Sequence, residues 1–301
     1  MIAGSRGTII AVVGAGNMGG SVAAALRRVG ADVVTAGAGR SAETRQRIAD
    51  AGLRDLGSVS ACAAVADLFL SIMPPEQAVA IAAEAAEAIA TSGRAPYYVD
   101  CNAIAPDTAR GIADVVEQAG ARFIDAGIIG NNPDSGRATR FYASGPYAEA
   151  LKLIEVAGRI AVPTVGSEIG QASGIKMCYA ALTKGTDALR VAMLLTAREL
   201  GLYDALLEEF AHSQSGKLAD MRAGLPTLAC DSGRWIGEME EIAKTFEAAG
   251  VTGKFHEGAA FIHRTLAASP LGSETRATAD RSRSLEDSLE AWASALPKRS
   301  A

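Results

Sequence analysis

The chain has few cysteines, few histidines and no basic run, and each shortage removes a class of function. Its four cysteines are widely spaced among 301 residues and form no CxxC pair. The sequence therefore predicts neither a zinc site nor a disulfide framework. The net charge is −5, with acidic and basic residues mixed along the chain, which disfavours a nucleic-acid partner. We expect no bound metal and no nucleic acid.

Long hydrophobic runs are also missing. Charged residues or glycines break the apolar stretches before they reach the roughly 18–20 residues that a membrane helix needs. The apolar start TIIAVVGAG leads into a glycine-rich turn and not into a signal-peptide cleavage site. Hydrophobic residues still make up 49% of the chain, enough for one or two globular domains. These features predict a cytoplasmic protein that does not contact membranes.

The N-terminal region carries the pattern of a dinucleotide-binding fold. A β-branched run at 8–13 leads into the pattern GxGxxG, and an alanine-rich helix follows. Placed between a strand and a helix, this pattern is typical of a pyrophosphate site. Its first glycine allows the tight turn, its second lets backbone N–H groups approach the phosphates, and its third lets helix and strand pack closely. A glycine-rich turn in another kind of α/β protein is the alternative. The predicted cofactor residues here are Gly14, Gly16, Asn17, Met18 and Gly19.

The turn after the second expected strand, residues 31–36, favours NADP over NAD. An NAD site would place an acidic residue there to bind the ribose 2′-hydroxyl, but the turn contains none. Arg40 and Ser41 occupy it, and arginine can hold a 2′-phosphate through a forked, charge-assisted contact. In the alternative interpretation Arg40 is solvated and Ser41 only caps the next helix.

Strand and helix patterns then alternate up to residue 166. This alternation predicts an α/β Rossmann-type domain with a doubly wound, mostly parallel sheet over residues 1–166. Ligands of such sheets bind beyond the carboxyl ends of the strands. That rule places Met73, Pro74, Asn102 and the stretch 125–132 around one crevice.

The strand signal ends after Gly166. Residues 168–199 predict one long helix, and the segments that follow are helical as well. We expect an all-α substrate and dimerisation domain over 167–301, joined to the first domain through the long helix. Apolar residues lie on more than one face of that helix, which predicts a homodimer.

Five motifs carry a resemblance to a known family. They are VGAGNMG at 13–19, SIMPPEQA at 71–78, the turn from Asp100 to Pro106, FIDA at 123–126 and GQASGIK at 170–176. Together they resemble the β-hydroxyacid dehydrogenase and 6-phosphogluconate dehydrogenase superfamily. The stretches RSAETR and RWIGEMEEIA are more similar to a branch whose helical C-terminal domain has no known function.

The resemblance implies an NADP-dependent oxidoreductase that acts on a small polar hydroxy acid or its carbonyl partner, with or without decarboxylation. Lys176 matches the family's general acid and base, with Asn102 and Tyr179 beside it in the site. Elimination supports Lys176, because hydride transfer at a carbinol needs an acid–base group and the three histidines stand late in the chain, in no motif. A lysine that merely reaches solvent is the alternative. Lys184, eight positions later, is expected at the rim of the cleft or against a partner subunit.

Several departures from the family pattern leave the substrate open. Tyr179 and Ala180 stand at the positions where the family places an asparagine, and the usual serine–glycine–glycine substrate loop is replaced. Glu238 takes the place of a lysine–aspartate pair, beside an arginine that could bind an anion. These changes keep an imine reductase as a second hypothesis, and an NADPH-binding sensor without turnover as a third. The predicted substrate-binding residues are Ile129, Gly130, Asn131, Asn132 and Arg234.

Overall fold

The computed structural model describes residues 7–297. The chain divides into two compact units, one ending at Met177 and the other beginning at Cys178. The division falls inside helix α6 (Gln171–Glu199), later than the boundary expected at 166. The helix therefore begins in the first unit and ends in the second.

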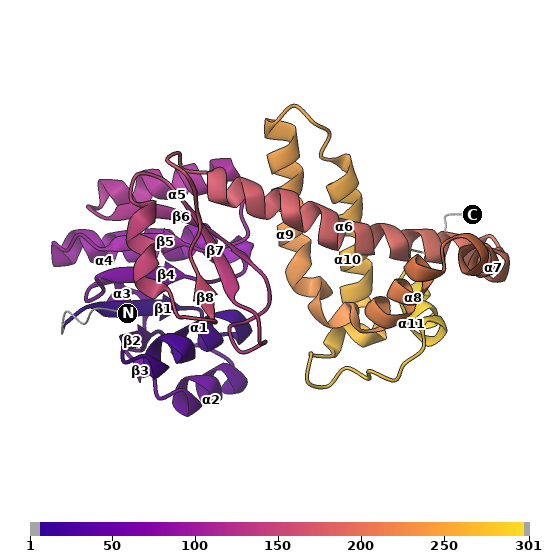
Figure 1. Ribbon diagram of the computed structural model, residues 1–301, viewed down its shortest axis with the longest axis horizontal. Coiled ribbons are helices and arrows are strands. Elements are labelled where there is room, and N and C mark those ends of the chain that lie inside the picture. Colours follow the sequence, from indigo (N-terminus) through magenta and orange to yellow (C-terminus); the bar gives the residue numbers. More distant parts are fainter. Residues whose placement is uncertain (1–6, 298–301) are drawn as a thin grey trace. The chain divides into compact units, whose positions relative to one another are not determined.

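The first unit is built on one twisted sheet with the strand order β3-β2-β1-β4-β5-β6-β7-β8, and β9 also pairs with β7 (Figure 1). Its strands are β1 (Ile9–Val13), β2 (Asp32–Thr35), β3 (Arg54–Asp55), β4 (Leu68–Ser71), β5 (Tyr97–Asp100), β6 (Arg122–Ile129), β7 (Thr139–Ser144), β8 (Ile160–Ala161) and β9 (Thr164–Gly166).

The strand pairing confirms the predicted Rossmann-type topology. Every pair from β3 to β6 is parallel. The pair β6–β7 is antiparallel, because the short connection 130–138 forms a hairpin and leaves no room for a crossover helix. β8 and β9 in turn run parallel to β7 and close this edge of the sheet.

Helices cover both faces of this sheet, as a doubly wound fold requires. One face packs its valines and leucines against α1, α2 and the short helix η2. The other face, which includes Phe69, Tyr98 and Phe123 in a stacked row, packs against α3, α4 and α5. These helices are α1 (Asn17–Arg28), α2 (Ala42–Asp50), α3 (Val59–Ala63), α4 (Ala78–Ser92), α5 (Pro106–Gln118) and η2 (Ala148–Ile154).

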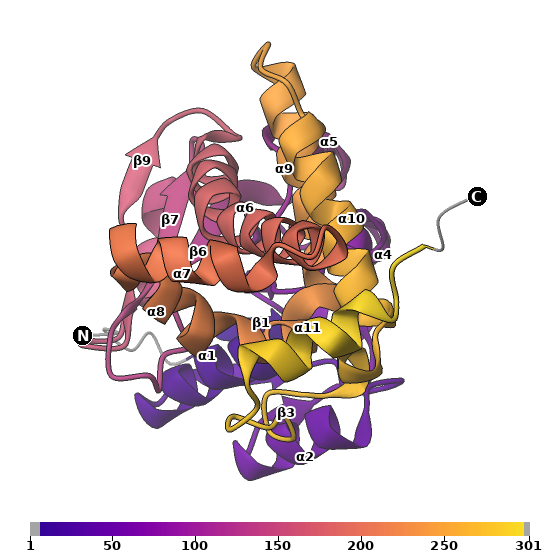
Figure 2. The ribbon, with the colours of Figure 1, turned by 90° about the vertical axis from the view of Figure 1, so that its right-hand side faces the viewer.

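All the secondary structure in the described residues of the second unit is helical, as the sequence predicts. In both ribbon views α9 and α10 run side by side (Figures 1 and 2). A separate apolar core, with Trp292 fully buried, joins the far part of α6 to the remaining helices. These are α7 (Tyr203–Ser213), α8 (Ser215–Gly224), α9 (Ala229–Ala248), α10 (Lys254–Ala268) and α11 (Leu285–Ala293), with short helices η3 (Leu225–Thr227) and η4 (Pro270–Ser273).

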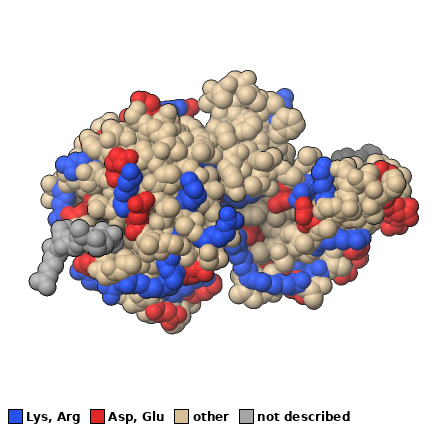
Figure 3. All heavy atoms as spheres, in the orientation of Figure 1, with Lys and Arg blue, Asp and Glu red and all other residues tan. Residues whose placement is uncertain are grey.

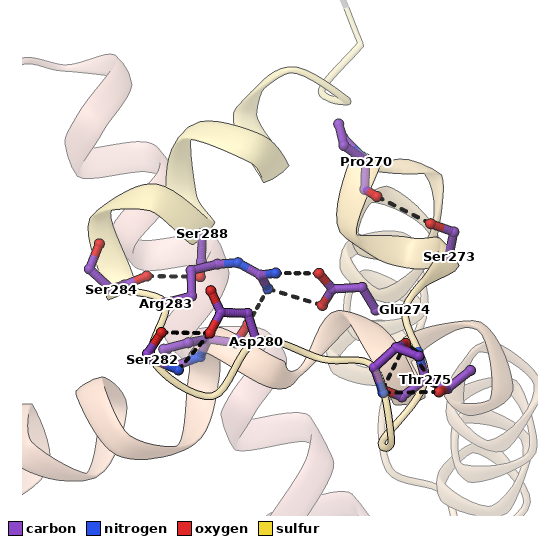
Figure 4. A network of polar contacts seen from close by, with 11 residues as sticks. Pro270, Ser273, Glu274, Thr275, Asp280, Ser282, Arg283, Ser284 and Ser288 are labelled. Carbon is purple, nitrogen blue, oxygen red and sulfur yellow. Dashed lines mark hydrogen bonds and ion pairs between the residues drawn. The ribbon is translucent and has the colours of Figure 1, made fainter.

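Polar contacts fix the long connection between η4 and α11 (Figure 4). Arg283 pairs with Glu274 through both guanidinium nitrogens and also donates to the carbonyl of Pro226 at 3.3 Å. Asp280 accepts from the backbone N–H and the hydroxyl of Ser282 at 2.8 and 2.6 Å. Ser284 then caps α11 by accepting the N–H of Asp287. Polar contacts therefore hold this connection at both of its ends.

Charges on the surface are mixed in sign and paired locally. Figure 3 shows lysine and arginine side chains interspersed with aspartate and glutamate. Asp134, for example, binds Arg28 at 2.8 Å and Arg159 at 2.6 Å. None of the helices within residues 7–297 is long and apolar enough to cross a membrane.

Candidate active site

The glycine-rich turn between β1 and α1 has the geometry of a pyrophosphate site. A Cβ on Gly14, whose φ is +98°, would lie 2.2 Å from the carbonyl oxygen of Ile72, and one on Gly19 would lie 2.2 Å from that of Gly14. Both positions therefore exclude any side chain. A Cβ on Gly16 would meet nothing within 4 Å. The second glycine thus faces open space, where a ligand can approach the backbone, while the other two serve packing.

The first turn of α1 presents unneutralised N–H groups to that space. Gly16 occupies the N-cap without a side-chain cap, and the first turn holds no acidic residue. The partial positive charge of the helix N-terminus is therefore available to an anion. Asn17 lies at the start of the helix, and its side-chain oxygen accepts from the amide of Asn132 at 3.3 Å. This contact brings the 129–132 loop to the nucleotide turn.

The turn after β2 holds Arg40 and Ser41, with different contacts. The Ser41 hydroxyl accepts the N–H of Thr44 at 3.2 Å and so caps α2. Arg40 is half-buried and its guanidinium lies 3.9 Å from the Sδ atom of Met73. Arg40 therefore lies beside a strand-end residue of the crevice, whereas Ser41 serves the helix.

Asp55 is a functional candidate that the sequence analysis missed. It ends the two-residue strand β3, and its Oδ1 accepts the N–H groups of Gly37 and Gly57, both at 2.8 Å. A Cβ on Gly37 would lie 2.1 Å from Asp55 Oδ2, so a side chain at this position would displace the Asp55 carboxylate. An acidic group thus does stand at the end of β2, but it comes from the neighbouring strand. A glycine at the expected acid position was the available signal.

The ends of β4 and β5 are tied together by Asn102. Its side-chain oxygen accepts the N–H of Met73 at 2.5 Å, and its amide donates to Ser71 Oγ at 3.1 Å and to Asp100 Oδ2 at 2.9 Å. Only 2% of Asn102 is exposed, and Met73 is buried as well, while Pro74 is partly exposed. The Asn102 side chain therefore holds the backbone of Met73 just beyond the end of β4.

Asp100 is the buried acid of this network. The pKa of Asp100 is raised to about 7, mainly by burial and also by the charge of Asp125, against the opposing hydrogen bonds from Asn102. Asp125 is its partner in register on β6. Two aspartates thus stand side by side in the sheet interior, close to the strand ends.

Lys176 lies in the first unit, on the second turn of α6, and is half-buried. A Cβ on Gly127 of β6 would lie 2.9 Å from the Lys176 Cβ and 2.5 Å from the carbonyl oxygen of Ala172. The bare backbone of Gly127 therefore lets α6 approach the sheet and seats Lys176 directly over β6. Tyr179 follows three positions later on the same helix and is 52% exposed.

The 129–132 loop is ordered by backbone and side-chain contacts. Gly130 has φ +115°, a conformation that favours glycine. The carbonyl of Asn131 accepts from the Thr139 hydroxyl at 2.5 Å. Ile129 and Asn132 are partly exposed and Asn131 is exposed. The exposed amide of Asn131 is therefore the polar group that this loop offers to solvent or to a ligand.

In the second unit, Lys184 does not lie at an exposed rim. It pairs with Glu238 and sits over the ring of Trp235, and the two charged side chains are only 17% and 7% exposed. Arg234 donates to Asp231 at 2.6 Å. Burial and then the charge of Lys184 lower the pKa of His263 to about 4, so this histidine is neutral at pH 7.

Comparison with known proteins places these features in a family. Residues 9–170 match the family described as the NAD binding domain of 6-phosphogluconate dehydrogenase, and residues 197–266 match a domain of unknown function, DUF1932. A 3-hydroxyisobutyrate dehydrogenase of Pseudomonas aeruginosa is 29% identical over 217 residues, which are 69% of this chain and 70% of that protein. These matches confirm the resemblance stated from the sequence.

Solved structures share the fold at lower identity. Mycobacterium tuberculosis 3-hydroxyisobutyrate dehydrogenase, solved with L-serine, is 19% identical, has a TM-score of 0.62, and the match covers 87% of this chain and 94% of that one. An imine reductase of Bacillus cereus is 17% identical with a TM-score of 0.53, over 94% and 98% of the chains. At these identities the likeness shows the fold alone.

Proposed function

The chain belongs to the family of the NAD-binding domain of 6-phosphogluconate dehydrogenase, and we propose that it is an NADP-dependent oxidoreductase. Its substrate would be a small polar hydroxy acid or the corresponding carbonyl compound. One observation carries the proposal: Lys176 is seated over Gly127 at β6, in the same unit as the open glycine turn.

The chain's own residues fit a dinucleotide. Gly16 leaves the turn open, and the first turn of α1 offers its N–H groups and no competing carboxylate. Met73 and Pro74 follow β4 and form the neighbouring wall, with Asn102 fixing the N–H of Met73. Bound NADP would supply the hydride acceptor for oxidation, and NADPH the donor for reduction.

Lys176 would handle the proton that accompanies the hydride. In oxidation its amine accepts the proton of the substrate hydroxyl as the C–H bond gives up a hydride, and in reduction its ammonium returns that proton to the carbonyl oxygen. Tyr179 lies one helical turn further along α6, and its hydroxyl is our candidate for a second contact with the substrate, beside that of Lys176. Asn131 is the candidate amide from the 129–132 loop.

The choice between NADP and NAD rests on Arg40 and Asp55. Arg40 offers a positive charge to a 2′-phosphate, whereas the Asp55 carboxylate would repel it. Arg40→Ala should weaken NADPH binding by roughly 10- to 100-fold and leave NADH binding unchanged, as loss of a charge-assisted contact predicts. Asp55→Asn keeps an oxygen for Gly37 and Gly57 and should strengthen NADPH binding. Fluorescence titrations with NADPH and NADH measure these affinities. An Arg40→Ala variant that loses as much affinity for NADH as for NADPH would indicate NAD as the cofactor.

The reaction itself is tested by nicotinamide absorbance with NADP and NAD separately. The panel contains small hydroxy acids including 3-hydroxyisobutyrate and serine, sugar acids, and cyclic imines in the reducing direction. Lys176→Ala should lower kcat by about 10²- to 10⁴-fold, the range for a lost general acid or base. Lys217→Ala, which removes an exposed lysine on α8, is the matched control and should retain full activity.

Other results of this panel identify other functions. Turnover of imines alone would replace the hydroxy acid with an imine substrate. Tight NADPH binding with no turnover across the panel, and with Lys176→Ala binding equally well, would favour the sensor. Carbon dioxide released together with NADPH would add decarboxylation to the reaction.

We also propose that the second unit forms a homodimer. Leu182 and Leu189 of α6 and Phe255 of α10 are 72%, 69% and 76% exposed, and all three line one apolar groove between these helices. Burying each such side chain contributes about 1.5–3 kcal/mol. Leu189→Glu should produce monomers in sedimentation at micromolar concentration. Val79→Glu, at an exposed valine of α4 in the first unit, should not.

A cytoplasmic location completes the proposal. All four cysteines are free, a state that a reducing compartment maintains. Fractionation of cells that express the tagged chain tests this, with recovery in a periplasmic or secreted fraction as the contrary result.

A further inference from the structure

At the N-terminus of α6, the N–H groups of three residues find their partners on the sheet. The first turn of the helix contains no acidic residue. The N–H groups of Gly170 and Ser173 both donate to Asp125 Oδ2, at 2.9 and 3.0 Å, and the N–H of Ala172 donates to Ser144 Oγ at 2.9 Å. Orphan amides at a helix start need such partners. Here β6 and β7 provide them, from residues far away in the sequence.

Asp125 is the centre of this arrangement. Its side chain is fully buried. Besides the two N–H groups it accepts the Ser173 hydroxyl on Oδ1 at 2.5 Å and the Ser144 hydroxyl on Oδ2 at 2.9 Å. A single carboxylate thus receives four hydrogen bonds, and its negative charge faces the positive end of α6. The contacts join β6, β7 and α6 at one point.

A second contact fixes the rotation of the helix. Asp125 and Gly127 are two residues apart on β6 and so face the same side of the sheet. Ser173 and Lys176 are three residues apart on α6 and so share one helix face. Ser173 binds Asp125, and the Lys176 Cβ lies over Gly127. Strand and helix are therefore matched at two positions, and the second position is Lys176.

We propose that Asp125 is a positioning residue that holds the Lys176 amine in place by capping α6 from the sheet. The inference rests on the proposed function, because it assigns Asp125 to the proton transfer that Lys176 would perform. Asp125 does not touch the reacting atoms. Its effect on Lys176 is transmitted through the first two turns of α6.

The test compares Asp125→Ala with Asp125→Asn. Asparagine keeps the oxygen that receives the two N–H groups and the Ser144 hydroxyl, and the Ser173 hydroxyl can rotate to accept from its amide. We expect Asp125→Ala to lower kcat by at least 100-fold with the best hydroxy acid of the panel. Asp125→Asn should recover activity to within about tenfold of wild type. NADPH affinity by fluorescence should change less than threefold in both. Equal losses in both variants, or a loss of NADPH affinity that matches the loss of kcat, would overturn the proposal.

A second variant and a second readout test the proposal even if Asp125→Ala does not fold. If Asp125→Ala does not fold, Ser173→Ala removes only the hydroxyl contact and should lower kcat several-fold. Ser58→Ala, which removes the cap of α3 in the same unit, should not change kcat. Brief amine acylation read by peptide mass spectrometry then compares Lys176 with Lys217 in one molecule. The relative reactivity of Lys176 should change at least threefold in Asp125→Ala or Ser173→Ala, and an unchanged ratio would overturn the assignment.

The acylation experiment also separates the positioning role of Asp125 from the proposed reaction. If no compound is turned over by wild type but the Lys176 ratio responds to Asp125, the positioning role stands and the proposed reaction fails. If turnover is found and Asp125→Ala retains wild-type kcat, the reaction stands and the positioning role fails.

Discussion

Asp100 offers a measurement that tests the buried network behind the crevice without any substrate. The pKa of Asp100 is about 7 in the folded protein because burial removes water from its carboxyl group. An unfolded aspartate titrates near 3.8. Between these values the folded chain keeps a proton that the unfolded chain has released. Stability should therefore fall as pH rises through this window.

The sign and size follow from this difference. Below about pH 4 the carboxyl group is protonated in both states, and its contribution to stability is fully present. Each pH unit above that costs about 1.4 kcal/mol up to about pH 7, and above pH 7 the carboxyl group is ionised in both states and its contribution is lost. From pH 5 to 7 the loss is therefore up to about 3 kcal/mol.

Urea unfolding of wild type and Asp100→Asn at pH values from 5 to 8.5 measures this pH-dependent loss of stability. The substitution also disturbs the contact with the Asn102 amide, but that offset does not depend on pH. The difference in unfolding free energy between the two proteins should therefore change by up to about 3 kcal/mol and level off above pH 7. Ser71→Ala removes a neutral partner of the same network and should give an offset without a slope. Parallel curves for wild type and Asp100→Asn would show that Asp100 is ionised throughout, which would refute the reasoning.

Three further predictions concern packing and charge. Gly127→Ala should destabilise the first unit by about 1–3 kcal/mol in urea unfolding, because its methyl group overlaps the backbone of α6, and unchanged stability would place the helix further from β6. Gly16→Ala should keep the free energy of unfolding within about 0.5 kcal/mol of wild type but lower dinucleotide affinity, whereas Gly19→Ala should destabilise the fold by about 1–3 kcal/mol. Dinucleotide titration and urea unfolding of both variants measure this, and a destabilised Gly16→Ala beside a stable Gly19→Ala would contradict it. Glu238→Gln leaves the Lys184 ammonium buried beside a neutral group and should lower the free energy of unfolding by about 3–5 kcal/mol. The double variant Lys184→Met with Glu238→Met should recover this stability in urea unfolding, and a double variant as unstable as Glu238→Gln would contradict the prediction.

The sequence predicted the first unit well where local chemistry determines structure. Glycines at GxGxxG positions and β-branched runs bounded by turns are local signals, and they located the nucleotide turn and the parallel strands that surround it. The start of α6 was expected three residues too early. The short strand β3, only two residues long, left no period to detect.

The contacts that the sequence did not predict share one property: the two partners are distant in sequence. Asp55 binds the N–H of Gly37, and Asp125 binds that of Ser173, 18 and 48 positions away. Lys184 meets Glu238 across 54 positions. Such contacts depend on how strands and helices are placed in space, and a pattern of spacing in one sequence contains no record of them. Motifs therefore located the ends of the strands, while the acids that hold those ends required the structure.

The two adjacent aspartates of β5 and β6 show why those acids matter together. They are partners in register and both are buried, yet they receive different numbers of hydrogen bonds. Asp125 has four donors from two strands and a helix, whereas Asp100 has two donors, both from Asn102. The charge of Asp125 is one of the causes that raise the pKa of Asp100. Two ionised carboxylates side by side in a sheet interior would repel strongly, so the acid with fewer donors keeps its proton to a higher pH than an ordinary aspartate does. The capping of α6 and the tie that holds Met73 are therefore coupled through charge, and a change at either aspartate should be felt at the other.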